Sequence, residues 1–263
     1  MERKIGDIEY NKSLAKSLSI LSSFDIEHPN QKVQEVSERL GINFSTASRH
    51  LAALYDLRFL DRNNNGEYYL NINILKMAGV ILHSSDVYRH AKHEIDKLSR
   101  ETEFHCNLGF LNDNKIFHMI SVVSENTVDL NTPLGVEHPL YCSSMGLLFL
   151  SQFSNEKLNY YFENTELIAF NECTEVDKKK IIKKANKAGV NNYSIIMDEY
   201  RLGKTSIAAP IYDRKGDIVA SISISGKTDD FDLKNKEMYY VKLVQDTAIN
   251  ISSKLGYFKT KLS

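Results

Sequence analysis

The sequence predicts an α+β protein with two domains, a small winged helix-turn-helix at the N-terminus and a larger α/β domain after it. The chain has 263 residues, which is more than one ordinary domain contains. Its N-terminal quarter carries the apolar spacing of short helices followed by a hairpin turn, and the rest mixes amphipathic helix patterns with β-rich runs. We expect the first domain over residues 10–71, a linker helix over 72–85 and the second domain over 86–257.

Composition and the lack of targeting signals predict a cytoplasmic protein. Hydrophobic residues make up 42% and charged residues 25% of the chain, as in a globular protein in solution. No apolar run approaches the ~18 residues that cross a bilayer, and residues 1–4 lack the apolar core of a secretory signal. Cys106, Cys142 and Cys173 lie far apart and form no C-x-x-C pair or metal-ligand cluster, which fits a reducing compartment. We therefore expect no membrane contact and no cofactor.

The N-terminal segment has the pattern of a helix-turn-helix. Gly41 can take the left-handed conformation that ends a helix in a tight turn, and Asn43 can cap the helix that follows. Two short helices joined by a glycine-containing turn form this unit. The apolar stripes that define the three expected helices are Leu14–Leu18–Leu21, Val33–Val36–Leu40 and Ala47–Leu51–Leu54.

The third helix presents small polar residues opposite its apolar stripe. At 100° per residue the outward face centres on Ser45 and Arg49, with Asp56 at its far end. Small hydroxyl side chains and one arginine let a helix approach the major groove of duplex DNA closely. We expect this helix to contact DNA through five residues: Ser45, Thr46, Ser48, Arg49 and His50.

A β-hairpin is expected directly after this helix. Residues 59–62 and 67–70 read as two strands joined by Asn63-Asn64-Asn65-Gly66, a strong turn signal. Such a hairpin is a wing, and Arg62 and Asn64 can donate to the phosphate backbone from it. The net charge of −1, and the equal numbers of basic and acidic residues before residue 81, give no general attraction to DNA. A module that binds a protein instead therefore stays open as the alternative.

The linker at 72–85 is apolar on more than one side. A helix of this kind is usually buried against a partner helix. One interpretation is packing within the chain. The other is a contact between two copies that places their recognition helices about one DNA turn, roughly 34 Å, apart. We favour the second interpretation.

The C-terminal two-thirds contains strand and helix patterns around a serine-rich segment. We expect helices over 86–101 and 233–255, strands over 106–111, 116–121, 205–211 and 218–225, and a further strand over 126–130. Ser143 and Ser144 enter the apolar run 147–151, where they can cap a helix or border an anion site. Serines at 221, 223 and 225 share one sheet face, which lines a polar pocket or meets solvent.

Four segments in this order resemble the IclR family of bacterial regulators over about residues 10–257: 45–51 (STASRHL), 138–146 (HPLYCSSMG), 206–213 (SIAAPIYD) and 220–226 (ASISISG). The resemblance implies a GAF-like effector domain, dimers or tetramers, and an effector that is a small carboxylate or aromatic acid. Ile196 stands where some relatives place an acidic pocket residue, and Lys204 adds positive charge nearby. The effector-binding positions that the resemblance implies are Ser144, Met145, Ser206, Ser223 and Ser225.

Catalysis is not expected. Cys142 beside a helix start is the only nucleophile candidate that the pattern suggests, and a buried structural cysteine explains it better. The chain has no P-loop, G-x-S-x-G, H-E-x-x-H or dinucleotide-binding fingerprint. The sequence thus predicts a transcriptional regulator that binds a double-stranded DNA operator as a homo-oligomer under the control of a small organic effector. The alternative is a winged-helix protein-interaction module with a ligand-sensing domain.

Overall fold

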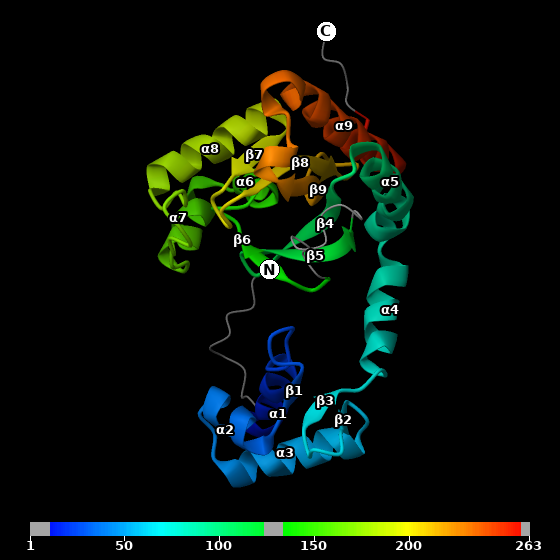
Figure 1. Cartoon of the computed structure of the whole chain (residues 1–263), viewed down its shortest axis with the longest axis vertical. Coiled ribbons are helices and arrows are strands. Elements are labelled where there is room, and N and C mark those ends of the chain that lie inside the picture. Colours follow the sequence, from blue (N-terminus) through cyan, green and yellow to red (C-terminus); the bar gives the residue numbers. More distant parts are fainter. Residues whose placement is uncertain (1–10, 124–133, 259–263) are drawn as a thin grey trace. The chain divides into compact units, whose positions relative to one another are not determined.

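The computed structural model of the chain describes residues 11–123 and 134–258 and separates into two compact units. The first unit ends at Ser84 and the second begins at Ser85 (Figure 1). The strand expected over 126–130 lies outside the described residues. Within the described segments, no helix combines the length and the apolar character needed to cross a bilayer.

The first unit is a winged helix-turn-helix. Gly41 adopts φ +61° after α2, and the Asn43 side chain accepts a hydrogen bond from the backbone of Thr46 at 2.8 Å, so the turn and the cap form as expected. A three-stranded sheet of order β1-β3-β2 completes the unit, and its strand β1, between α1 and α2, is an element that the sequence did not indicate. The elements are α1 (Lys12–Ser22), β1 (Asn30–Gln31), α2 (Val33–Leu40), α3 (Phe44–Asp56), β2 (Leu60–Arg62), β3 (Tyr68–Leu70) and α4 (Ile74–Ser84).

The core of this unit differs from the expected one at α1. Leu14 and Leu18 are 57% and 53% exposed, whereas Ile20 is fully buried and Phe24 lies beside it in the same cluster. The expected inward stripe of α1 was therefore wrong at Leu14 and Leu18, whereas Leu21 packs against the cluster as expected. Helix α1 carries apolar residues on more than one side, so their spacing alone does not say which side meets α3. The cluster of buried residues is Ile20, Phe24, Val36, Ala47, Leu51, Leu54, Leu60 and Tyr68.

The second unit is built on a six-stranded antiparallel sheet of order β6-β5-β4-β9-β8-β7. Its strands are β4 (His105–Asn112), β5 (Lys115–Val122), β6 (Glu137–Pro139), β7 (Ser194–Met197), β8 (Lys204–Tyr212) and β9 (Ile218–Lys227). Its helices are α5 (Asp86–Thr102), α6 (Ser144–Leu150), α7 (Asn155–Glu163), α8 (Lys178–Asn191) and α9 (Leu233–Lys254), with a short 3-10 turn, η3 (Thr228–Asp230).

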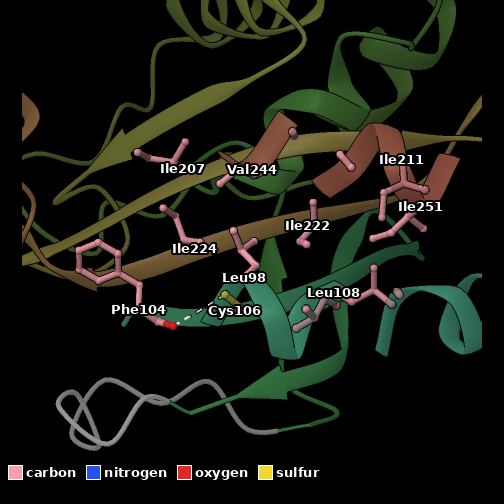
Figure 2. Close-up of a cluster of buried hydrophobic side chains, with 14 of the residues drawn as sticks. Leu98, Phe104, Cys106, Leu108, Ile207, Ile211, Ile222, Ile224, Val244 and Ile251 are labelled. Atoms are coloured by element: carbon pink, nitrogen blue, oxygen red, sulfur yellow. Dashed lines mark hydrogen bonds between the residues drawn. The ribbon is translucent and has the colours of Figure 1, made fainter. Parts of the chain in front are cut away.

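Strand alternation gives this sheet two different faces. Ile222 and Ile224 of β9 join the core under α5 and α9, where Leu98 and Val244 pack against them (Figure 2). The residues between them in β9 point to the other face of the sheet, which α6 covers. Helix α8 packs on α6. Ser221 and its alternate neighbours are therefore buried, and the solvent-exposed alternative for these serines is excluded.

Candidate functional site

The outward face of α3 carries the polar side chains expected there. Ser45 and Arg49 are exposed, and Ser48 is partly exposed beside them. The Ser45 hydroxyl donates to the Asn43 side chain at 3.0 Å, so the same asparagine caps α3 and orients this serine. The helix thus presents a short polar surface with one guanidinium group, dimensions that suit a major groove.

Two residues expected to contact DNA lie inside the domain instead. Thr46 is 9% and His50 6% exposed. The His50 Nδ1 atom lies 2.8 Å from the Ser17 hydroxyl of α1, and burial, with the nearby Arg49 charge, lowers the pKa of His50. Thr46 and His50 are four residues apart and border the apolar Ala47 stripe, so both turn toward the interior of the unit. They position α3 rather than face outward.

The hairpin between β2 and β3 is tied together by its own side chains. Asn63 accepts hydrogen bonds from the backbone of Asn65 and Glu67, both at 3.0 Å. Arg62 donates to the Gly66 carbonyl at 3.2 Å, and its guanidinium carbon lies 5.2 Å from the centroid of the Tyr68 ring. Arg62 and Asn64 remain exposed at this tip.

The second unit contains a cavity of about 50 Å³ between the sheet and the start of α6, called the α6 cavity below. All five positions that the family resemblance implied lie on its wall, although they come from three separate parts of the sequence. Seven further polar or charged residues join them. The lining residues are Asn107, His118, His138, Cys142, Ser143, Ser144, Met145, Ile196, Tyr200, Arg201, Lys204, Ser206, Ser223 and Ser225.

Hydroxyl groups hold α6 against strand β8 at this cavity. The Ser144 and Ser206 hydroxyls lie 2.8 Å apart, and Ser206 also reaches the Ile224 carbonyl at 3.2 Å. Ser194 donates to the Ser144 carbonyl. Ser143 caps α6 by accepting from the Gly146 backbone at 3.1 Å, so the capping interpretation of this serine is confirmed.

A pair of histidines forms another part of the wall. His118 Nε2 lies 3.2 Å from His138 Nδ1, and the His138 ring packs against Tyr200 with centroids 4.4 Å apart. Burial lowers the pKa of His118 well below its ordinary value and that of His138 to about 4, and the Lys204 charge acts in the same direction. Both imidazoles are therefore neutral at physiological pH.

Lys204 and Arg201 give the α6 cavity its positive charge. Burial lowers the pKa of Lys204 to about 8, with a smaller effect from Arg201, so the amine remains mostly protonated at neutral pH. None of the described lining residues is acidic. An electropositive wall with several hydroxyl groups favours a small anion.

Sequence reasoning missed the polar residues that β4, β5 and β6 contribute to this wall. Asn107 and His118 alternate with buried apolar residues, as the serines of β9 do, and this alternation was the available signal. The alternation does not show which strands pair. In the sheet β4 lies between β5 and β9, although β9 follows β4 in the sequence by more than a hundred residues.

Family models match both units of the chain. The model described as "IclR helix-turn-helix domain" matches residues 13–64, and the one described as "Bacterial transcriptional regulator IclR C-terminal" matches residues 79–253. The chain belongs to the IclR family. It is a transcriptional regulator with a DNA-binding helix-turn-helix and a GAF-like α/β ligand-binding domain.

Two curated IclR-family relatives align over nearly the whole chain. The HTH-type transcriptional regulator KipR of Bacillus subtilis is 27% identical over 247 residues, covering 94% of this chain and 98% of KipR. The HTH-type transcriptional repressor AllR of Salmonella typhi is 28% identical over 249 residues, covering 93% and 90%. An IclR homologue from Microbacterium hydrocarbonoxydans, solved in complex with 4-hydroxybenzoate, superposes with a TM-score of 0.81 at 20% identity, covering 92% of this chain and 98% of that one.

Within this IclR-family domain, Cys142 is not an activated nucleophile. The thiol is buried, and burial raises its pKa to about 12, with Glu199 adding to the effect. Because the thiolate is the reactive form, Cys142 is inert at neutral pH. The described part of the chain also holds no group of three or more side chains suited to a metal ion.

Proposed function

We propose that this protein works in the cytoplasm as a homodimer that binds an operator through α3 and responds to a small organic acid in the α6 cavity. The observation that carries the proposal is the exposed pair Ser45 and Arg49 on the third helix of a matched helix-turn-helix. Residues of such a helix contact base edges in the major groove, while the wing lies on the backbone.

Five side chains are available for these contacts. Ser45, Ser48 and Arg49 face outward on α3 and are assigned to base edges, and arginine is the residue that most often pairs with guanine there. Arg62 and Asn64 at the wing tip are assigned to phosphates. Thr46 and His50 hold α3 in place, because their side chains are buried against the rest of the unit.

Helix α4 supports the homodimer. None of its residues is buried, although several are large and apolar. Leu75, Val80 and Ile81 are 61%, 69% and 58% exposed, and Ile72 just before the helix is 74% exposed. A contiguous apolar surface of this kind marks an interaction site. A second copy covering α4 would bring two α3 helices to the two halves of one operator.

An acid as the effector follows from the chemistry of the α6 cavity. Lys204 supplies positive charge, and the Ser144 and Ser206 hydroxyls are suited to carboxylate oxygens. The complex of the Microbacterium homologue with 4-hydroxybenzoate supports the same class of ligand. Enzymatic activity is not part of the proposal, since both curated relatives are named regulators and Cys142 is inert.

A mobility-shift titration against the DNA upstream of the chain's own gene tests the operator contact. Arg49→Ala should weaken binding about 5- to 150-fold, because a good arginine–base pair is worth about 1–3 kcal/mol. Arg100→Ala is the matched control: it removes the same charge from an exposed position on α5 of the other unit and should leave DNA affinity unchanged.

The wild-type band must also weaken with salt, because phosphate contacts release counterions. If wild-type protein shifts no DNA at low salt but retains a protein partner after Arg49→Ala, the protein-interaction alternative replaces this proposal.

A further inference from the structure

Two buried polar atoms on the wall of the α6 cavity have no protein partner among the described residues. Asn107 and His118 are each only 2% exposed. The Asn107 amide nitrogen reaches the Ser225 hydroxyl at 3.5 Å, but its Oδ1 atom accepts no hydrogen bond there. His118 uses Nε2 toward His138, and its Nδ1 atom is likewise unmatched. Buried polar atoms are normally satisfied, so this pair indicates a ligand that satisfies both.

The two atoms belong to one part of the wall. Strands β4 and β5 are neighbours, and Asn107 pairs with Ser223 of β9 while His118 pairs with Gly109 of β4. A Cβ atom at Gly109 would lie 2.8 Å from the Met145 sulfur. Met145, which also lines the cavity, therefore packs directly on the β4 backbone.

The cavity admits only a short molecule. Its volume is about 50 Å³, and one water-sized atom needs about 10–15 Å³ measured in this way. About three to five non-hydrogen atoms therefore fit the free cavity, which is the size of a two-carbon acid with at most one substituent. An aromatic acid has about twice as many atoms.

The bonding capacity of the two atoms specifies the substituent. Asn107 Oδ1 can only accept, so the ligand must donate to it. The direction of the hydrogen bond between the two neutral imidazoles depends on their tautomers. When His138 Nδ1 donates to His118 Nε2, His118 Nδ1 carries a proton, so the ligand must also accept. A hydroxyl group does both. A keto oxygen only accepts, and a hydrogen atom does neither.

We propose that the α6 cavity selects a short 2-hydroxy acid, with Asn107 and His118 as the specificity-determining residues that bind its hydroxyl group. This inference rests on the proposed function, in which the carboxylate binds beside Lys204. The ligand hydroxyl donates to Asn107 Oδ1 and accepts from His118 Nδ1, so the hydrogen-bonded chain continues through His118 to His138.

Isothermal titration calorimetry of the full-length protein tests this selection with three sets of ligands: glycolate and both lactate enantiomers, acetate and propionate, and the keto acid pyruvate. The hydroxy acids should bind at least tenfold more tightly than the other two sets, because a site built for a hydroxyl rejects analogues that lack it. Benzoate should not bind. Equal or tighter binding of the keto acid or of the unsubstituted acids overturns the inference.

Asn107→Ala supplies a second measurement. It should reduce lactate or glycolate affinity to that of propionate or acetate, and leave the affinity for the unsubstituted acids within about twofold. Asn112→Ala is the matched control, since Asn112 is exposed at the end of the same strand and does not line the cavity. A ligand-free melting curve for each variant confirms folding. Retention of hydroxy-acid preference by folded Asn107→Ala would overturn the role of that residue.

The two proposals fail in different ways. If no short carboxylate binds while operator DNA is still shifted, the acid-binding part of the proposed function is wrong and this inference falls with it. If short acids bind with no preference for a hydroxyl, the proposed function stands and only the inference is overturned.

Discussion

Lys204→Met replaces the ammonium group on the wall of the α6 cavity with an uncharged side chain of similar length. A charged hydrogen bond to a carboxylate contributes about 1.5–3 kcal/mol, so the substitution should weaken binding of the effector about 10- to 150-fold. The change should fall on ligand affinity and not on DNA affinity of the ligand-free protein, because Lys204 belongs to the second unit and α3 to the first.

The pH dependence of the wild-type protein gives the same prediction independently. The carboxylate binds the protonated amine, and the pKa of Lys204 in the ligand-free protein is about 8. Affinity is therefore steady below that pH and falls as pH rises through it. Between pH 7 and pH 9.5 the protonated fraction decreases about 30-fold. Two other groups on the wall do not titrate in this window: His138 has a pKa of about 4 and Cys142 one of about 12.

Titration calorimetry of a short 2-hydroxy acid from pH 7 to pH 9.5 measures both effects. Wild-type affinity should drop about 30-fold over this range, and Lys204→Met should be weak and flat. Lys215→Met, which removes an exposed lysine in the turn between β8 and β9, should behave as the wild type. A wild-type affinity that does not change with pH, or a Lys204→Met variant that still shows the drop, would refute the assigned role of Lys204.

Two further substitutions test the N-terminal unit. Val80→Lys should dissociate the homodimer in sedimentation equilibrium without lowering the melting temperature, because Val80 is 69% exposed. The control Val190→Lys, at an 82% exposed site on α8, should remain dimeric. The reverse result would place the interface elsewhere. Gly41→Ala should lower the free energy of unfolding by about 1–2 kcal/mol in urea denaturation, since φ is +61° and no atom lies within 4 Å of the added Cβ; an unchanged value would contradict the left-handed turn.

Local chemistry made the helix-turn-helix predictable. The left-handed Gly41, the Asn43 cap and the turn at Asn63–Gly66 each depend on a few consecutive residues, and the structure forms all three. Spacing also predicted that Ser223 and Ser225 share a face. Periodicity identifies which residues lie together, because side-chain direction follows directly from helix and strand geometry.

The errors arose where an element meets its neighbour. Helix α1 has apolar residues on several sides, and only its packing against α3 decides that Ile20 is buried and Leu14 exposed. His50 follows the conspicuous Arg49 in sequence, yet its ring turns inward to the Ser17 hydroxyl. Asn107 and His118 reach the α6 cavity through strand pairings between distant segments, and single-sequence patterns carry no record of such pairings.

The central claim is that an acid in the α6 cavity changes how tightly α3 holds DNA. Fluorescence anisotropy of a labelled operator, titrated with the full-length protein at zero and at saturating effector, measures this coupling directly. We predict a change in DNA affinity of about 5-fold or more, absent in Lys204→Met at the same effector concentration. Saturation of the cavity, verified by calorimetry in the same buffer, with no change in DNA affinity would contradict the claim.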